Sequence, residues 1–261
     1  MTKTSLLLYS FILSCLIFFS FTRKDKPTLF LVGDSTVSGG WGRFMHQHLD
    51  TNQIAITNRA VSGTSSRSYY TGVIHDQSLA KYGMWAKVMK DIKKGDYVFI
   101  QFGHNDDSPV VDTLRARGSL PGIGPDSTIV TNHFSRAKET VHTYGWYLNQ
   151  MVKEVKKKGA FAVICSPIPM DKWKDGKVIR GDERYGKWSK ESAERANTYF
   201  IHLNHLIADK YDQAGEKQIS SHFTADHVHP TTAGSIFMAN VVAEGIRNTK
   251  DLKLNQYLKQ Q

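Results

Sequence analysis

The sequence predicts an α/β protein in which a central parallel sheet of about five strands is sandwiched between two layers of helices. Short and almost continuously apolar segments recur along the chain, and patterns of helical spacing lie between them. Strands that are apolar on both faces are typical of parallel sheets with helices on each side. Hydrophobic residues make up 40% of the 261 residues and there are two cysteines, which excludes a disordered chain and a disulfide scaffold.

Five segments have the composition of buried strands. They lie at 28–32, 54–57, 97–102, 161–165 and 218–220. The third is entered through the turn Lys94-Gly95-Asp96, and the fourth contains Cys165, which we expect to be a buried and unreactive thiol. Because the strands alternate with helices, we expect one doubly wound domain.

The helices are predicted from apolar residues at helical spacing. They lie at 41–49, 78–92, 135–158, 191–211 and 233–246. The third ends in a lysine cluster followed by Gly159, which is typical of a helix C-terminus. Two stretches lack periodicity, 106–131 and 170–187, and we expect long loops there.

Residues 1–22 are predicted to be a targeting segment. Lys3 precedes an uncharged and mostly apolar run over 5–21, and charged residues follow it. This pattern indicates a secretory signal, with an uncleaved membrane anchor or a lipid-modified Cys15 as alternatives. The folded domain is therefore expected over 27–261, in an exported protein.

The chain is basic, with 34 Lys and Arg against 24 Asp and Glu and a formal charge of +10. Such a balance favours an acidic partner, which leaves nucleic acid, an anionic membrane or an acidic polymer open. The sequence contains no recognised nucleic-acid motif, and export separates the protein from nucleic acid. We therefore expect no nucleic-acid partner, and membrane contact only through residues 1–22 if they are retained or lipidated.

Polar and small residues follow the first three strands at the edge where parallel sheets bind ligands. Ser35 follows the first strand, Gly63 the second and Asn105 the third. Serine at this position is a candidate nucleophile, although it also caps helices and forms turns. An asparagine amide and an unobstructed glycine N–H are suitable donors to a developing oxyanion.

A fourth segment, Asp226-His227-Val228-His229, supplies a carboxylate and an imidazole. An Asp three residues before a His can fix the tautomer of the ring, which leaves the other nitrogen to take a proton from a serine. A metal site formed with His222 and His227, or an ordinary polar loop, is an alternative interpretation.

In order and spacing these segments resemble the SGNH (GDSL-type) hydrolase superfamily. The resemblance covers 29–246 and rests on Ser35 in GDS, Gly63, Asn105 in GHND and His229 in DHVH. It implies a flavodoxin-like fold with Ser35, Asp226 and His229 as catalytic triad. It implies an oxyanion hole formed by Ser35, Gly63 and Asn105, and requires no cofactor and no metal.

Further residues narrow the resemblance to the rhamnogalacturonan acetylesterase branch. They are GWG at 40–42 and SSRSY at 65–69. For substrate binding we consider Trp41 and Trp188, which suit stacking on sugar rings or packing, and Arg67, which suits a uronic acid or a structural ion pair. The expected partner is an acetylated acidic polysaccharide, bound by a monomer.

The expected function is removal of acetyl groups from pectic rhamnogalacturonan, through an acetyl-serine intermediate. Alternatives are an acetylesterase for xylan or another glycan, and a GDSL-type lipase or thioesterase. The segments near the candidate nucleophile, 64–71 and 106–124, are largely polar, which disfavours a lipase groove. A non-catalytic binding module is disfavoured because all three triad residues are present.

Overall fold

A five-stranded parallel sheet forms the centre of the computed structural model, which describes residues 26–76, 78, 84–181 and 183–260. The strands lie in the order β2-β1-β3-β6-β9. Their bounds are β1 Thr28–Gly33, β2 Ala55–Asn58, β3 Tyr97–Gln101, β6 Phe161–Cys165 and β9 Tyr199–Ile201. Since every pairing is parallel, the segments that follow β1, β2, β3 and β6 all leave the sheet at one edge.

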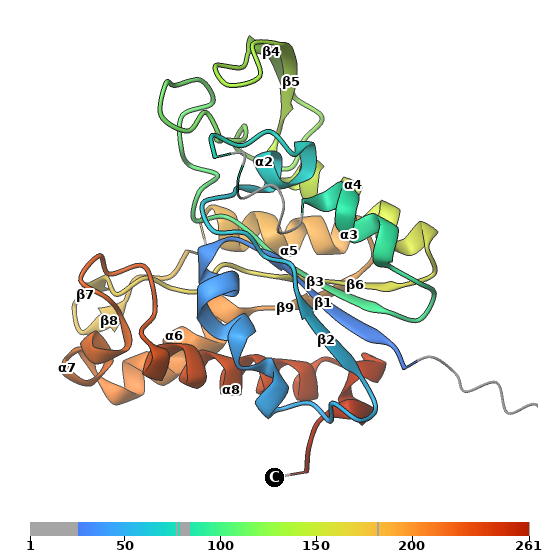
Figure 1. Ribbon diagram of the computed structural model, residues 1–261. Helices are drawn as coiled ribbons and strands as arrows, with labels where there is room; N and C mark the ends of the chain where they lie inside the picture. Colours follow the sequence, from blue (N-terminus) through green and yellow to red (C-terminus); the bar gives the residue numbers. More distant parts are fainter. Residues whose placement is uncertain (1–25, 77, 79–83, 182, 261) are drawn as a thin grey trace, which may run out of the picture.

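Helices cover both faces of this sheet (Figure 1). On one face lie α2 Ser66–Thr71, α3 Trp85–Asp91, α4 Tyr144–Lys157 and α5 Tyr185–Arg195. On the other lie α6 Leu203–Ala214, α8 Thr232–Asn248 and the short turns η1 Thr36–Gly40, η2 Trp41–Arg43 and η3 Met45–Gln47. Smaller elements are α7 Glu216–Ile219, η5 Ser220–His222 and η6 Lys253–Tyr257. The three-layer α/β/α fold predicted from the sequence is confirmed.

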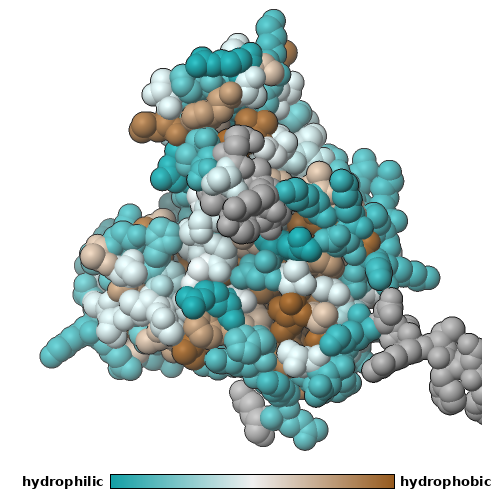
Figure 2. Space-filling model, viewed as in Figure 1, coloured by the Kyte–Doolittle hydropathy of each residue, from teal (hydrophilic) through white to brown (hydrophobic). Residues whose placement is uncertain are grey.

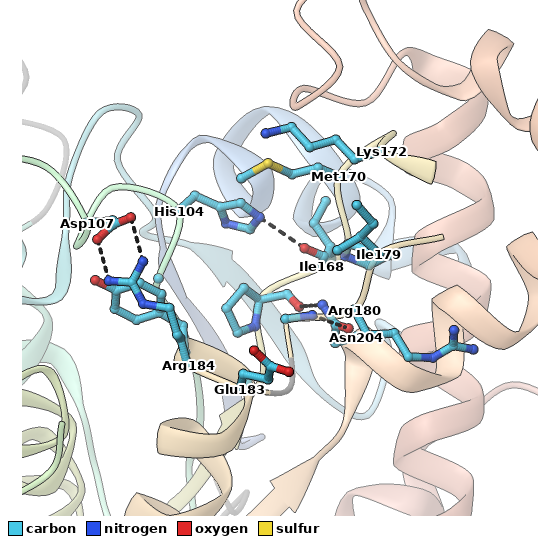
Figure 3. Close-up of a pocket in the computed structure, with 16 residues that line it drawn as sticks. His104, Asp107, Ile168, Met170, Lys172, Ile179, Arg180, Glu183, Arg184 and Asn204 are labelled. Atoms are coloured by element: carbon cyan, nitrogen blue, oxygen red, sulfur yellow. Dashed lines mark hydrogen bonds and ion pairs between the residues drawn. The ribbon is translucent and has the colours of Figure 1, made fainter. Parts of the chain in front are cut away.

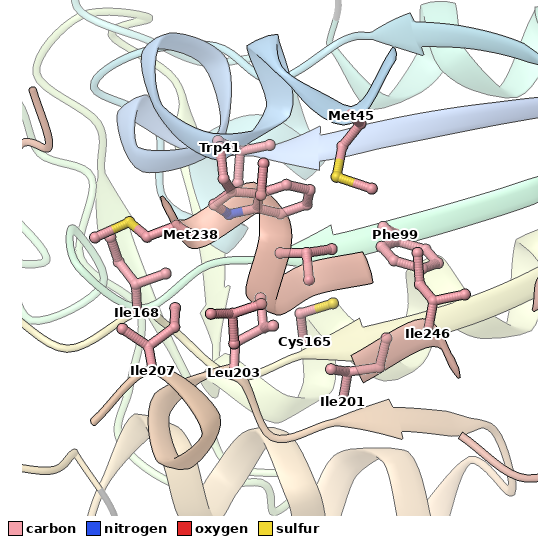
Figure 4. Packing of buried hydrophobic residues seen from close by; sticks show 14 of the residues in the cluster. Trp41, Met45, Phe99, Cys165, Ile168, Ile201, Leu203, Ile207, Met238 and Ile246 are labelled. Carbon is pink, nitrogen blue, oxygen red and sulfur yellow. The ribbon is translucent and has the colours of Figure 1, made fainter. Parts of the chain in front are cut away.

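The apolar strands bury alternate residues on opposite faces. In β1, Leu29 and Leu31 join one hydrophobic cluster, while Phe30 and Val32 join the other. Figure 4 shows the first cluster, in which Cys165 lies among aliphatic side chains and is buried, as expected. Period-two alternation between two cores explains why these strands are apolar throughout.

The fifth strand is not where the sequence predicts it. Residues 218–220 belong to α7 and η5, and the edge strand is β9, inside the segment 191–211 that was predicted as one helix. Helix α5 ends at Arg195, and Asn197 takes a left-handed conformation with φ 46°. A left-handed Asn is a common helix terminator, and the Tyr-Phe-Ile sequence after it suits a strand.

Other element boundaries also differ from those predicted. The helix expected at 135–158 begins at Tyr144, because Thr143 caps it and Lys138–His142 forms β5. Strand β5 pairs with β4, Ser127–Thr131, in a hairpin that projects beyond the helical layer (Figure 1). The loop expected at 170–187 contains the hairpin β7 Trp173–Lys174 and β8 Lys177–Val178 and the start of α5.

Two predicted helices are shorter in the structure. Residues 41–49 form two short 3₁₀ turns, and α3 accounts for the described C-terminal part of the helix expected at 78–92. The expected targeting segment 1–22 lies outside the described residues. Across the described ranges, no helix is both long and apolar enough to cross a membrane.

The surface in the view of Figure 2 is largely hydrophilic. Among the described residues, the large hydrophobic side chains that are exposed are Ile129 in β4, Val111 and Leu114 between β3 and β4, and Ile179 after β8.

Candidate active site

Ser35 is placed by a tight turn at the end of β1. Gly33 closes the strand where a side chain has no space, because an added methyl group would lie 2.6 Å from the carbonyl oxygen of Gln101. The backbone N–H groups of Val37 and Ser38 then donate to the carbonyl of Asp34, which turns the chain directly into η1. Ser35 is thereby held at the sheet edge, half-buried, with its hydroxyl in a cavity.

His229 brings a ring nitrogen to this hydroxyl from the far end of the sequence. Its Nε2 lies 2.8 Å from Ser35 Oγ, and its Nδ1 lies 2.5 Å from Asp226 Oδ2. The structure therefore joins the three residues proposed as a triad into one hydrogen-bonded chain. Both His229 and Asp226 are about half exposed, so the chain opens to solvent.

The loop that carries His229 is fixed by the other oxygen of Asp226. This Oδ1 accepts the backbone N–H groups of Val228 and His229, each at 2.9 Å, and the hydroxyl of Thr224 at 2.8 Å. The N–H of His229 is the leading cause that holds the pKa of Asp226 well below its usual range. Asp226 is therefore a carboxylate, which accepts hydrogen bonds and donates none.

Gly63 and Asn105 line the same cavity as Ser35 and His229, with a volume of about 620 Å³. Gly63 has φ +80°, a conformation that glycine adopts without strain. One amide N–H of Asn105 donates to the carbonyl of Thr64 at 2.8 Å, which fixes the side chain and leaves its second N–H for another acceptor. The structure thus brings together the residues expected to form an oxyanion hole.

Two buried side chains, His104 and Asp34, are in contact beside these loops, and no role was expected for His104 from the sequence. The Nδ1 of His104 lies 3.3 Å from Asp34 Oδ2, and its Nε2 lies 3.1 Å from the carbonyl of Ile168. Asp34 also accepts the N–H and hydroxyl of Thr36, so it forms the turn and joins it to the segment after β3. The signal available in the sequence was a histidine shortly after the third strand, directly before Asn105.

Asp106 ties α2 to the long loop. It accepts the hydroxyls of Ser66 and Ser119, at 2.5 and 3.0 Å. Burial raises the pKa of Asp106 to about 6, against these hydrogen bonds, which act to lower it. Asp106 therefore fixes the backbone directly after Asn105.

Two of the three residues considered for substrate binding are corrected by the structure. Trp41 is fully buried among the hydrophobic side chains of the core (Figure 4). Its turn η2 packs against α8, and its Nε1 donates to Gln101 Oε1 at 2.9 Å. Arg67 is also buried, and it forms a two-pronged ion pair with Glu139. Trp41 is enclosed by its packing and Arg67 is paired with an internal carboxylate, so neither side chain has a face open to a sugar.

Trp188 is half-buried and its ring contacts are internal. It packs against Tyr144 and Tyr185, and the guanidinium of Arg184 lies over its ring. The cavity with Ser35 is lined by other residues of the described chain. Two of these, Arg115 and Arg117, were missed in the sequence, where they lie in the long loop expected at 106–131.

A second cavity, of about 380 Å³, lies beside His104 (Figure 3). Its lining includes Ile168 and Met170, and an ion pair between Asp107 and Arg184 stands at its edge. Within the described ranges it has no lining residue in common with the cavity at Ser35. The two cavities are thus separate, with the segment after β3 running past both.

The alternative metal site was based on four side chains near residue 226. Of these, His227 Nδ1 lies 2.9 Å from Asp171, and His222 packs against Tyr211 and Phe237. In the part of the chain that the structure describes, no group of three or more His, Cys, Asp or Glu side chains is placed to hold a metal ion. The hydrogen-bonded arrangement of Ser35, His229 and Asp226 suits nucleophilic acyl transfer.

Comparison with known proteins points to the same class of protein, enzymes that hydrolyse acyl esters. Residues 31–235 match the GDSL-like Lipase/Acylhydrolase family, and the chain belongs to that family. The resemblance inferred from the motifs is therefore confirmed.

Curated relatives include two proteins named for one activity. A rhamnogalacturonan acetylesterase of Emericella nidulans (strain FGSC A4) is 28% identical, over 84% of this chain and 84% of its own. A probable rhamnogalacturonan acetylesterase of Bacillus subtilis (strain 168) is 27% identical, over 82% and 86%.

Solved structures share the fold at lower identity. A Bacillus subtilis protein superposes with a TM-score of 0.64 at 22% identity, over 85% of this chain and 56% of its own. An acetylxylan esterase from Geobacillus stearothermophilus superposes with a TM-score of 0.52 at 19% identity, over 84% and 94%. These likenesses establish the fold.

Proposed function

We propose that this protein is a serine esterase that removes O-acetyl groups from pectic rhamnogalacturonan. The observation that carries the proposal is the hydrogen-bonded chain from Ser35 through His229 to Asp226. The names of two curated relatives support the substrate.

The proton positions follow from the partners of His229. Because the Asp226 carboxylate only accepts, Nδ1 of His229 carries the proton between them, and Nε2 accepts the hydroxyl proton of Ser35. Ser35 Oγ attacks the acetyl carbon while its proton passes to Nε2. The bond from the acetyl carbon to the sugar oxygen then breaks, and Nε2 returns the proton to that oxygen, which leaves an acetyl-serine.

The second half repeats this sequence with water. His229 Nε2 takes a proton from the water that attacks the acetyl carbon, and Ser35 leaves with that proton as acetate is released. In both halves the negative oxygen is stabilised by the second amide N–H of Asn105 and the backbone N–H groups of Gly63 and Ser35. Such a donor typically contributes about 100- to 1000-fold to turnover.

The polar lining of the cavity favours a carbohydrate over a lipid. Six of the nine described residues that line it are serine, asparagine, arginine or histidine, and none has an aromatic or long aliphatic side chain, whereas a lipase needs an apolar groove for an acyl chain. An acetyl group is small enough to need none. Acetylated xylan is the second candidate substrate, favoured by the acetylxylan esterase among the proteins of the same fold.

We also propose that the protein is exported and acts outside the cytoplasm. The support is the basic start and apolar middle of residues 1–22. N-terminal sequencing of protein recovered from the periplasm or medium tests this. Retention of full-length protein in the cytoplasm would contradict it.

Acetate release from acetylated rhamnogalacturonan and acetylated xylan tests the function. The wild type should release acetate faster from the pectic polymer, and Ser35→Ala should lose at least about 1000-fold of the activity. Ser135→Ala, an exposed serine between β4 and β5, is the control and should match the wild type. No release from any ester by the wild type would refute the esterase, and faster release from xylan would refute the substrate.

A further inference from the structure

Two arginines of the long loop face the candidate nucleophile across one cavity. Arg115 and Arg117 line it together with Ser35, Gly63 and His229. A methyl group added at Gly63 would lie 3.4 Å from Nη1 of Arg115 and 3.7 Å from Nη1 of Arg117. Both guanidinium groups therefore lie close to where the substrate ester must sit.

Arg117 has internal partners. Its Nη1 donates to the carbonyl of Gly63 at 2.6 Å, and its Nε donates to Ser108 Oγ at 3.1 Å. The side chain is half-buried, and burial and the neighbouring Arg115 lower its pKa. Arg117 thus holds Gly63 in position through this hydrogen bond to its carbonyl.

Arg115 differs because its side chain has no such partner. Its backbone N–H donates to Asp112 Oδ1 at 2.5 Å, but its guanidinium forms no hydrogen bond or ion pair with any residue that the structure describes. Asp112 Oδ1 also accepts the N–H groups of Leu114 and Ala116. Arg115 is thus an exposed cation, without a counter-ion among the described residues, at the wall of the catalytic cavity.

The surrounding charges favour an anion at this position. Arg117 adds a second positive charge beside Arg115. Burial and the two arginines hold the pKa of the nearby His75 below its usual value, although Asp76 and Asp112 act in the opposite direction. A guanidinium presents paired N–H groups that match a carboxylate, and it binds one more strongly than a neutral acceptor. The two guanidinium groups therefore favour a substrate in which a sugar next to the acetyl ester carries a carboxylate.

We propose that Arg115 binds the carboxylate of a uronic acid in the substrate chain and thereby selects acidic over neutral acetylated polymers. This inference rests on the proposed esterase function. It transfers to Arg115 the role that the sequence suggested for Arg67, whose guanidinium is occupied by Glu139. The competing role for Arg115 is direct stabilisation of the oxyanion near Gly63, which would affect every ester equally.

Three substrates separate these roles for Arg115→Gln. They are acetylated rhamnogalacturonan with free carboxylates, the same polymer with its carboxyls methyl-esterified, and 4-nitrophenyl acetate, which is small and neutral. We expect kcat/KM on the free-acid polymer to fall about 10- to 100-fold, chiefly through KM. On the other two substrates it should stay within about two-fold, since the hydrolytic residues are untouched. Arg43→Gln removes an exposed charge from η2, outside the cavity lining, and should match the wild type on all three.

A binding measurement complements the kinetics. Acetyl-free oligogalacturonate should inhibit hydrolysis of 4-nitrophenyl acetate by the wild type, and its inhibition constant should rise at least about ten-fold in Arg115→Gln. Arg115→Lys should recover part of this affinity, because it keeps the charge and loses the paired geometry. Thermal melting checks that each variant is folded.

The outcomes distinguish failure of the role proposed for Arg115 from failure of the proposed esterase function. An equal loss on all three substrates would assign Arg115 to the oxyanion and overturn the carboxylate role. Unchanged kinetics on the free-acid polymer, with the wild type active, would overturn it too. Wild-type release of acetate from neutral xylan alone would refute the pectic substrate and the role of Arg115 together, while the serine esterase would stand.

Discussion

His104 and Asp34 form a buried pair that joins the two loops carrying Asn105 and Ser35. The side chain of His104 is 5% exposed and that of Asp34 is fully buried, with 3.3 Å between Nδ1 and Oδ2. The Nε2 of His104 faces the carbonyl of Ile168, which only accepts, so both ring nitrogens donate and the ring is an imidazolium. A charged pair thus lies one residue from each of two proposed catalytic groups.

The pair makes stability depend on pH. Although burial opposes the charged form, Asp34 raises the pKa of His104 above 6.5. Burial likewise opposes charge on Asp34, yet His104 holds its pKa below 3.8. The contribution of His104 is present below pH 6.5 and is lost as pH rises through its raised pKa. The contribution of Asp34 is present above pH 3.8 and is lost as pH falls through its lowered pKa.

We therefore predict that His104→Gln lowers the free energy of unfolding by about 3 kcal/mol at pH 5.5, because it leaves a buried carboxylate unpaired. The difference from the wild type should shrink as pH rises toward 9. Urea unfolding at both pH values, followed by circular dichroism, measures it. His46→Gln removes an exposed histidine and should show little effect at either pH. A difference that is the same at both values would contradict the predicted loss of the His104 contribution over this pH range.

The layered fold was predictable because burial on both faces of β1, β3 and β6 leaves a strong pattern in the sequence. The edge strand β9 was not, because three residues next to a helix carry too little periodicity to stand out. Likewise, β5 is a polar strand of a hairpin. The strong helical pattern of α4 begins directly after it, so a prediction that averages over neighbouring residues extends the helix across β5. In both places the chain changes direction through local capping, at Asn197 and Thr143.

The candidate site was predictable where its geometry is local or matches a family motif. Asp226 and His229 are three residues apart in one turn, so their contact follows from their spacing. The roles of the arginines were not predictable. Glu139, the partner of Arg67, lies in a strand that was predicted as helix. Arg115 and Arg117 lie in a long loop, and the sequence does not indicate which carboxylates such a loop brings near them.

The ion pair of Arg67 and Glu139 should contribute to stability. Its N–O distances are 2.7 and 2.8 Å, and Arg67 also donates to the carbonyls of Val110 and Gly118. We predict that Glu139→Gln costs about 3 kcal/mol, because the arginine then remains buried without its counter-charge.

A double-mutant cycle with Arg67→Gln measures the coupling of this pair by chemical unfolding. The double variant should cost less than the sum of the two single variants. The exposed pair of Lys190 and Glu194 on α5 is the matched control, and its coupling should be below about 1 kcal/mol. Coupling as small for Arg67 and Glu139 as for this surface pair would contradict the prediction.

Trp41 should act through packing. Its Nε1 donates to Gln101 Oε1, and Gln101 donates in turn to Thr36 Oγ1 next to Ser35. We predict that Trp41→Phe lowers the free energy of unfolding by about 1–3 kcal/mol, since Gln101 loses its donor in the core. KM for the polymer should stay unchanged. Chemical unfolding and initial-rate kinetics measure both quantities, and a raised KM with unchanged stability would restore the sugar-stacking role.

Asn105 should contribute to turnover more than to binding. One amide N–H is held by Thr64, and the proposed oxyanion needs the other only when the tetrahedral intermediate forms. We predict that Asn105→Ala lowers kcat on 4-nitrophenyl acetate by about 100- to 1000-fold, with a change in KM below about three-fold. Asn52→Ala, an exposed asparagine in the turn before β2, is the control and should match the wild type. A rise in KM with unchanged kcat would place Asn105 in substrate binding and remove it from the oxyanion hole.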